Sequence, residues 1–239
     1  MLTWTDEQIL FMQEATEYEG FNVRLAELIR PYLAPDATIC DAGCGLGYLS
    51  AALAPHVKHI TCVDINPRAI HFAQKMCHEK GLANVTSLCA DMCQCQDMFD
   101  NIIFCLYGSI EEAVTISRRC CRGKVVVIKR NYTEHRFSML PRQRLLDHYA
   151  SSADYLTAQG IKFAQCSFSL RMGQPFRSLE EAKHFFELYS HVDDPALITD
   201  TFVQNKLIPI RHGDYQYYMP HDRQLGLLVW DAQEGNRHA

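Results

Sequence analysis

Short apolar runs alternate with amphipathic segments along the first half of the chain. The runs with the length and composition of strands are 38–42, 59–63, 85–89, 101–106 and 125–128. Between them, apolar residues recur three or four positions apart, as a helix with one buried face requires. The helix after the second run is the clearest, because Asn66 can cap it and Pro67 suits its first turn. Strands that alternate with helices predict an α/β fold, a mostly parallel sheet with helices on both faces.

The first strand is preceded by two expected helices and followed by another. A capping box at Thr5 and Gln8 predicts a helix toward Glu19. A second helix is expected over 21–30, closed by prolines, and a third over 46–53. The run 125–128 is β-branched throughout, so we expect the fifth strand near the middle of the sheet.

The second half of the chain is less regular. The expected elements there are a helix over 142–159, a strand over 161–170, a helix from a capping box at Ser178 and Glu181 to Tyr189, and a last strand over 225–230. A polar, aromatic insertion precedes that strand, which brings the sheet to about seven strands. No linker divides the chain, so we expect one domain over 1–239, with an N-terminal helical cap over 1–35, a cofactor-binding core over 36–130 and a substrate side with the C-terminal strands over 131–239.

Composition agrees with a folded, cytoplasmic protein. The chain is 48% hydrophobic and 21% charged, which excludes most disordered sequences. No apolar run approaches the roughly 20 residues of a membrane span, and the first residues lack a secretory pattern. Eleven cysteines are an odd number, and several lie inside expected strands, so we expect reduced thiols. The group Cys89, Cys93 and Cys95 lacks the spacing of a structural zinc site, so no metal is expected.

Charge is unevenly distributed. The net charge is -5, but the segment 118–144 holds nine Lys or Arg and a single acid, Glu134, which leaves -13 for the rest. This segment predicts either a local anion-binding face or a solvated helix face. A nucleic-acid footprint over the whole chain is absent, although nucleic acid stays open as a partner.

A glycine-rich turn follows the first strand, as Asp41-x-Gly43-x-Gly45-x-Gly47. Glycines allow a sharp bend and let a ligand approach main-chain N–H groups. A dinucleotide fingerprint would need a small third residue, but counting from Gly43 places Tyr48 there. The acid at Asp41 would attract an ammonium group and repel a pyrophosphate. Both observations disfavour NAD.

This turn resembles motif I of the class I S-adenosylmethionine-dependent methyltransferases, which have a Rossmann-like fold. Three further segments are similar to the family's next motifs, in the same order: Val63-Asp64-Ile65-Asn66, Cys89-Ala90-Asp91-Met92 and Phe99-Asp100-Asn101-Ile102-Ile103-Phe104. The resemblance covers about 36–130 and extends to later segments in outline. It implies an enzyme that uses S-adenosylmethionine and releases S-adenosylhomocysteine.

The resemblance also implies roles for single residues. The Asp64 carboxylate would bind the ribose hydroxyls, and Asp91 or its neighbour would reach the adenine amino group. Asp41 would bind the methionine ammonium directly or through water, or orient the loop amides. The cofactor-binding candidates together are Asp41, Gly43, Cys44, Gly45, Gly47, Asp64, Ile65, Asp91, Met92 and Cys105.

Acceptor residues are expected at the carboxyl ends of the later strands and on the N-terminal helices. The fourth-strand loop, Cys105-Leu106-Tyr107-Gly108, lacks the Asn-Pro-Pro-Tyr pattern of relatives that methylate planar amino groups. Tyr107 and His135 are the candidates for a catalytic group. The acceptor-binding candidates are Tyr18, Tyr107, Lys129, Arg130, Arg136 and Arg171. The cations among them favour a small, anionic methyl acceptor.

Other functions stay open at this point. Methylation of RNA or protein is the nearest alternative. An NAD-linked oxidoreductase would share the sheet and Asp64, and a non-catalytic protein could hold the cofactor without using it. The sequence does not determine the oligomeric state, or whether the methylated atom is O, N, C or S.

Overall fold

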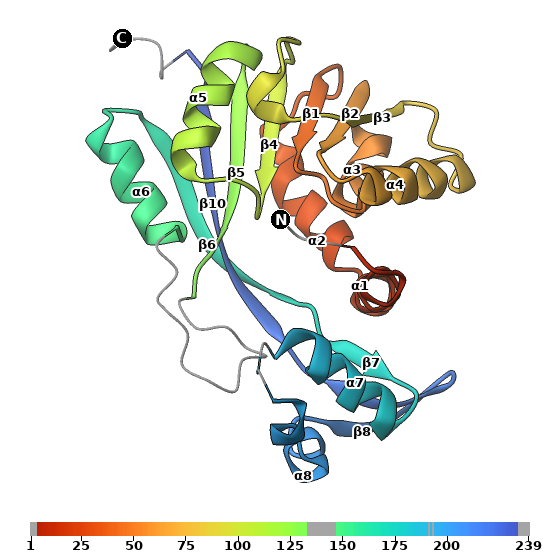
Figure 1. The fold of residues 1–239 in the computed structure, drawn as a ribbon. Coiled ribbons are helices and arrows are strands. Elements are labelled where there is room, and N and C mark those ends of the chain that lie inside the picture. The colour runs from red at the N-terminus through yellow and green to blue at the C-terminus, as the bar shows by residue number, and fades with distance from the viewer. Residues whose placement is uncertain (1–3, 133–146, 191, 193, 234–239) are drawn as a thin grey trace.

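The computed structural model of the chain describes residues 4–132, 147–190, 192 and 194–233. Its centre is a seven-stranded sheet, seen in the upper part of Figure 1. The strands lie in the order β3 (Val85–Cys89), β2 (His59–Asp64), β1 (Thr38–Ala42), β4 (Asn101–Cys105), β5 (Lys124–Arg130), β10 (Asp222–Asp231) and β6 (Phe163–Arg171). β1 to β5 are parallel, and β10 is antiparallel to both β5 and β6. The expected seven-stranded, mostly parallel sheet is confirmed.

Helices cover both faces of this sheet. On one face, α2 (Phe21–Ile29) and α3 (Tyr48–Leu53) share a core with β1, β2, β5 and β10. On the other, α5 (Ile110–Cys120) and α6 (Tyr149–Ala158) pack on β4, β5 and β10. α4 (Pro67–Glu79) contacts β2 and β3, and its N-terminus is capped by the Asn66 side chain as expected. The switch in strand order between β1 and β4 places the ends of both strands at one edge, where open α/β sheets bind ligands.

A second, smaller sheet lies below the first in Figure 1 and was not predicted from the sequence. Its strands lie in the order β7 (Gln174–Phe176), β9 (Tyr215–Met219) and β8 (Ile208–His212). It packs with α7 (Leu179–Tyr189), α8 (Asp200–Gln204) and the N-terminal helix α1 (Asp6–Glu19). The Phe11 ring of α1 lies 5.1 Å from the Phe185 ring of α7.

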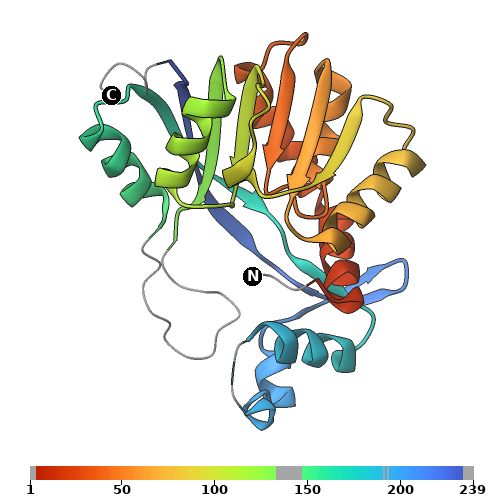
Figure 2. The same ribbon diagram turned by 45° about the horizontal axis from the view of Figure 1, so that its top comes forward.

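The two sheets are connected by an antiparallel pair of strands. β6 continues into β7 and β9 continues into β10, and the Met172 N–H donates to the His221 carbonyl between them. Figures 1 and 2 both show β6 and β10 running out of the large sheet toward the small one. The insertion expected before the last strand therefore forms a separate layer that is joined to the large sheet by its own strands.

Several element boundaries differ from the expected ones. The third helix begins at Tyr48 and not at Leu46, because Gly47 has a φ of +75°, outside the helical region. The second helix ends at Ile29 and continues as a 3-10 turn, Arg30–Tyr32, that contains Pro31. β10 is longer than 225–230 and β6 runs to Arg171. Of the helix expected over 142–159, residues 142–146 lie outside the described residues.

The two capping boxes had different outcomes. At α1, Thr5 accepts from the Gln8 N–H and the Gln8 side chain accepts from the Thr5 N–H, as predicted. At α7, Ser178 accepts from the Glu181 N–H, but the Glu181 carboxylate accepts from the Arg177 N–H and pairs with the Arg177 guanidinium. The second box is therefore only half formed, because a neighbouring cation competes for its acid.

Candidate functional site

The glycine-rich turn lies at the carboxyl end of β1 and leads into α3. Gly43, Gly45 and Gly47 have φ values of +68°, +53° and +75°, which side chains other than glycine rarely adopt. The N–H groups of Gly43 and Cys44 donate to the Val63 carbonyl at 2.8 and 3.0 Å. The turn is thus attached to the end of the neighbouring strand β2.

Gly43 is needed for a second reason. A Cβ at this position would lie 2.1 Å from the Tyr107 ring, so the aromatic ring covers the backbone of the turn directly. Tyr107 also stacks on Phe104, with centroids 6.4 Å apart and planes 6° from parallel. The loop after β4 is therefore packed against the loop after β1.

Asp64 ends β2 and connects two loops through its carboxylate. One oxygen accepts from the Gly45 N–H at 2.9 Å, and the other accepts from the Asn66 N–H at 2.8 Å. A carboxylate has about four lone-pair positions, so these contacts leave room for two further donors. The next residue, Ile65, is 49% exposed and presents an apolar surface beside this acid.

Asp41 is the last residue but one of β1 and is almost inaccessible, with 1% of its surface exposed. Its carboxylate accepts a hydrogen bond from the Ser50 hydroxyl of α3 at 2.6 Å. Burial raises the pKa of Asp41 to about 6; the hydrogen bond from Ser50 opposes this and the charge of Asp64 adds to it. The acid spans the glycine turn from strand to helix, which fits the expectation that it orients the loop.

Asp91 follows β3 and caps a short 3-10 turn, Met92–Gln94. Its carboxylate accepts from the Cys93 N–H at 2.8 Å. Met92 is fully buried and supports the turn from below, with its sulfur 3.7 Å from the Cys40 thiol. Cys105 lies half-buried at the end of β4, where burial raises the pKa of its thiol to about 12. The ten cofactor-binding candidates therefore gather along the ends of β3, β2, β1 and β4, which are neighbours in the sheet.

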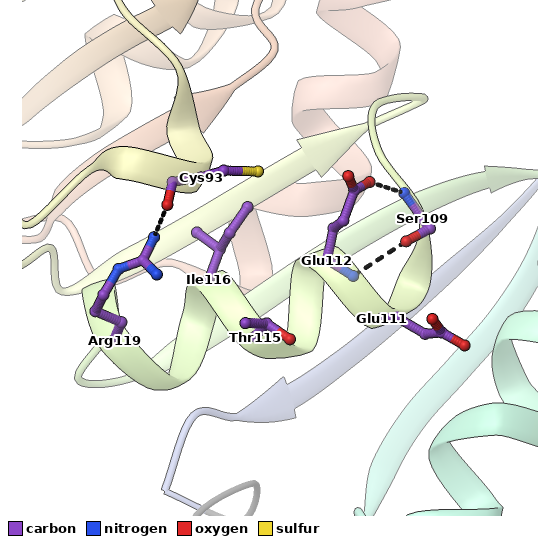
Figure 3. Close-up of a pocket in the computed structure, with 7 residues that line it drawn as sticks. All are labelled: Cys93, Ser109, Glu111, Glu112, Thr115, Ile116 and Arg119. Atoms are coloured by element: carbon purple, nitrogen blue, oxygen red, sulfur yellow. Dashed lines mark hydrogen bonds between the residues drawn. The ribbon is translucent and has the colours of Figure 1, made fainter.

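A pocket of about 510 Å³ lies beside the turn that holds Asp91. Figure 3 shows its residues: Ser109 and Glu112 form the capping box of α5, and Arg119 reaches from the end of this helix to the backbone of Cys93. The Arg119 guanidinium donates to the carbonyls of Cys95 at 2.8 Å, Cys93 at 2.9 Å and Met92 at 3.2 Å. Arg119 thus fixes the turn without belonging to it.

The Tyr107 hydroxyl was one of two expected catalytic groups. Burial raises the pKa of Tyr107 to about 12, and the nearby Cys93, Glu112, Asp91 and Asp64 add to this effect. The phenol is therefore protonated at neutral pH and can donate a hydrogen bond, whereas it is a poor general base. The other expected group, His135, and the acceptor candidate Arg136 lie outside the described residues.

The remaining acceptor candidates are in different surroundings. The buried Lys129 ammonium contacts the Gly108 carbonyl and the Asp147 carboxylate, both at 2.5 Å, so its hydrogen-bonding capacity is largely used within the protein. Arg130 is exposed at the end of β5. Arg171 is exposed and pairs with Asp222. Tyr18 stacks on Tyr218 of the small sheet at 5.3 Å, and not on the glycine turn.

The described part of the basic segment, 118–132, does not form one continuous face. Lys124 lies at the amino end of β5, where it pairs with Asp231, whereas Lys129 and Arg130 lie at the carboxyl end. Arg119 faces the turn after β3. Among the described residues, the positive charge of this segment is therefore divided between two edges of the sheet.

Three residues near the site were missed as site residues. Trp4 approaches the glycine turn, since a Cβ on Gly45 would lie 3.7 Å from its indole. Arg119 holds the turn after β3, and Arg223 of β10 lies near Cys105. The sequence carried no signal for these three, because each acts on residues that are distant along the chain.

All eleven cysteines are free thiols. The Cys89 thiol donates to the Ile65 carbonyl at 3.7 Å, and the Cys120 thiol donates to the Cys95 carbonyl at 3.2 Å. Within the described ranges, no group of three or more His, Cys, Asp or Glu side chains is arranged to hold a metal ion. The helices described in the structure are all too short or too polar to cross a bilayer.

Comparisons with known proteins agree with this geometry. Residues 39–122 match a family model described as a methyltransferase domain. A malonyl-[acyl-carrier protein] O-methyltransferase of Anoxybacillus flavithermus is 37% identical over 109 residues, which are 41% of this chain and 41% of that protein. The chain thus spans less than half of the length of this curated relative.

Solved structures resemble nearly the whole fold. The YcgJ protein of Bacillus subtilis superimposes with a TM-score of 0.56 at 13% identity, covering 87% of this chain and 97% of that one. The magnesium protoporphyrin IX methyltransferase of Synechocystis, solved with bound S-adenosylhomocysteine, gives 0.51 at 16% identity, covering 95% and 89%. At 13% and 16% identity, these resemblances show a common fold and do not extend to the function.

Proposed function

We propose that the chain, whose residues 39–122 match a methyltransferase domain, is a class I S-adenosylmethionine-dependent methyltransferase that transfers the cofactor's methyl group to a small organic anion. The proposal has two parts. The first assigns the ends of β1 to β4 to the cofactor, within 36–130. The second assigns the carboxyl end of β5, the beginning of β10 and the rest of 131–239 to the acceptor.

The residues at the ends of β1 and β2 fit the cofactor. The observation that carries the proposal is the Asp64 carboxylate, held by two amides with two acceptor positions left, as a pair of ribose hydroxyls requires. Ile65 supplies an exposed apolar surface next to it. Gly45 leaves the face of the turn open except for Trp4. Asp91 would meet the adenine amino group, and the turn amides would meet the methionine end.

The chemistry demands positioning more than acid–base groups. When bound, the cofactor supplies a methyl group that its sulfonium already activates. The protein then has to align the acceptor with that methyl, and alignment alone corresponds to about 7–11 kcal/mol of barrier. Tyr107, stacked between Phe104 and the glycine turn, is placed to orient a group by hydrogen-bond donation. A base is needed only for an acceptor that must lose a proton.

An anionic acceptor is supported by the cations near the ends of β5 and β10. Arg130 and Arg223 lie there, and Arg136 follows in the sequence. The names of the matched proteins do not separate the acceptor classes, because they include a malonyl-[acyl-carrier protein] O-methyltransferase and a ribosomal RNA small subunit methyltransferase A. The division of the described basic residues between two edges of the sheet favours a small organic acceptor over RNA.

The experiment is calorimetric titration of the full chain with S-adenosylhomocysteine, with NAD as a parallel ligand. We expect micromolar binding of the first and no heat from the second. Asp64→Asn keeps one acceptor and should weaken binding about tenfold, whereas Asp64→Ala should weaken it ten- to a hundred-fold, since a charge-assisted hydrogen bond is worth about 1.5–3 kcal/mol.

Asp97→Ala is the matched control, because Asp97 is an exposed acid on the loop after β3. It should leave the affinity unchanged. Equal affinities of folded Asp64→Ala and wild-type protein would remove Asp64 from the site. Binding of NAD in place of S-adenosylhomocysteine would overturn the proposed function.

A further inference from the structure

Arg223 lies on β10 just beyond the part of this strand that pairs with β5. The pairing of Leu225 with Arg130 places Arg223 past the carboxyl end of β5, where it pairs with Leu170 of β6. Side chains alternate along a strand, so Arg223 shares the face of Leu225 and Leu227, which belong to the core under α2. Its guanidinium lies over the Phe21 ring of α2, 5.5 Å from the centroid.

This guanidinium has no anionic partner among the described residues. Its Nε atom is inaccessible to water and makes no hydrogen bond. Other arginines of the same region are paired: Arg171 with Asp222, and Arg177 with Glu14. An arginine stays charged in proteins, and the Arg223 side chain as a whole is only half-buried, so its guanidinium stays within reach of a ligand. A partly desolvated cation with an unsatisfied Nε–H is a place where an anion from outside the chain can bind.

The charges around Arg223 favour the same conclusion. Burial lowers the pKa of Arg223 and the nearby Arg130 lowers it further, while Tyr132 and Cys105 act in the opposite direction. Two cations thus share this place, and among the described residues no carboxylate pairs with either of them. The charge of Asp41 raises the pKa of the Cys105 thiol and the charge of Arg223 lowers it, so Arg223 lies near the cofactor loop.

The surroundings also restrict the kind of anion. Phe21, Phe168 and Leu170 line the same face and pack against the core. An inorganic anion would gain nothing from these apolar side chains, whereas a carboxylate on an apolar body would use both them and the guanidinium fork. Arginine meets a carboxylate with two parallel hydrogen bonds, which also fixes the orientation of the bound molecule.

We propose that Arg223 binds the carboxylate of an organic acid whose apolar part rests on the half-buried Phe168 and Leu170, and that this contact selects the methyl acceptor. The inference rests on the proposed function, since it names the substrate class of that same site. Arg223 anchors the acceptor by a group that is not itself methylated. Arg130, exposed at the end of β5, adds a second positive charge near Arg223.

The test is calorimetry of the full chain, with and without S-adenosylhomocysteine, using octanoate as the apolar carboxylate and inorganic phosphate as the bare anion. Arg223→Met keeps the length of the side chain and removes its charge. We expect octanoate to bind wild-type protein at millimolar concentration, phosphate to bind more weakly, and the variant to bind octanoate at least tenfold more weakly. Arg211→Met, at an exposed arginine of β8, is the control and should bind as wild type does.

Thermal unfolding separates a ligand site from a structural role. Because Arg223 is half-buried and makes no ion pair among the described residues, Arg223→Met should leave the Tm of the ligand-free protein unchanged within about 2 °C. If the contact with Phe21 were the reason for the arginine, the variant would have a lower Tm. A lower Tm, or equal octanoate affinity in the variant, overturns the inference.

The two ligands make the failures distinguishable. If the protein binds S-adenosylhomocysteine but Arg223→Met leaves its affinity for octanoate unchanged, this inference is overturned and the proposed function is supported. If the folded protein does not bind S-adenosylhomocysteine, the proposed function is overturned, and with it the claim that the bound acid is a methyl acceptor.

Discussion

Asp41 and Asp64 lie at the carboxyl ends of neighbouring strands, yet their carboxylates are in opposite situations. Asp64 keeps acceptor positions at the surface of the glycine turn, whereas Asp41 is buried against Ser50. Burial raises the pKa of Asp41 from 3.8 to about 6, so its ionised form is disfavoured in the folded protein. The acid that joins β1 to α3 across the glycine turn therefore reduces stability at neutral pH.

We expect this cost to appear in the pH dependence of folding. Between pH 4 and pH 6 the native state binds more protons at Asp41 than the unfolded chain does, so its contribution to stability falls as pH rises and is constant above that window. The loss is about 3 kcal/mol for a shift of this size. Asp41→Asn should lack it, which urea unfolding of both proteins at pH 4, 5, 6 and 7 can measure.

The difference in unfolding free energy between the two proteins isolates Asp41 from other titrating groups. It should move in favour of Asp41→Asn as pH rises, while the exposed control Asp36→Asn should show no trend. A difference that is constant with pH would contradict the burial of this carboxyl as the cause.

Residues at strand ends were predictable and residues on distant elements were not. Asp41 and Asp64 lie at the carboxyl ends of β1 and β2, and Asp91 follows β3; the apolar runs of these strands are visible in the sequence, so their common edge could be inferred. Arg223 stands between Asp222 and Gln224, a pattern typical of an exposed strand end. It is half-buried because its guanidinium lies over the ring of Phe21, some 200 residues earlier.

At the scale of elements, α5 holds the turn after β3 through Arg119. Its three hydrogen bonds to carbonyls keep Asp91 beside the ends of the other strands. A neutral hydrogen bond contributes about 0.5–1.5 kcal/mol, and more when the donor is charged. The end of a helix thus positions a loop that it does not itself contain.

We expect Arg119→Met to weaken binding of S-adenosylhomocysteine about three- to ten-fold, and of adenosine by the same factor, because the adenine end of the site loses its support. Calorimetry with both ligands measures this. Arg122→Met, at an exposed arginine just past the same helix, should change neither affinity. An unchanged affinity in Arg119→Met would show that the turn keeps its shape alone.

Helices with clear caps were predicted, and the small sheet was missed for identifiable reasons. The side chains of Asn66 and Thr5 accept hydrogen bonds from N–H groups in the first turns of α4 and α1. The starts of these helices are therefore determined by residues that are close together in the sequence. β7 has three residues and β8 contains Pro209, and neither shows apolar alternation. Their pairing depends on β6 and β10 carrying them to the same place.

At the scale of the whole molecule, one ion pair links the N-terminal helix to the small sheet. The buried Glu14 of α1 lies 2.6 Å from the Arg177 guanidinium, which also meets Glu181 and Asp214. Burial raises the pKa of Glu14, and Arg177 opposes that rise. Tyr218 adds a hydrogen bond to Glu19 of the same helix. The helix that begins the chain is therefore attached to its last quarter.

We expect Arg177→Met to lower the free energy of unfolding at pH 7 by about 3 kcal/mol, because it leaves the Glu14 charge buried without a cation. The loss should shrink toward pH 4 as Glu14 becomes protonated, and Glu14→Gln in the Arg177→Met background should restore part of it. Urea unfolding at both pH values measures each step. Lys183→Met, which breaks an exposed pair with Asp200, should leave the free energy of unfolding almost unchanged.

A stability of Arg177→Met that does not depend on pH would place the effect in packing and not in charge. The N-terminal helix would then be held by Phe11 and its aromatic neighbours alone. The predicted domain division, with residues 1–35 as a cap, would in that case describe a layer joined by apolar contacts.

The approach of Trp4 to Gly45 also equips the molecule with an optical reporter. The chain has two tryptophans, and the other, Trp230, is buried in the core beneath α6. A molecule that settles on the glycine turn removes water from the Trp4 indole and leaves the surroundings of Trp230 unchanged. Emission from a single fluorophore therefore records arrival at this turn, against a constant background from the second.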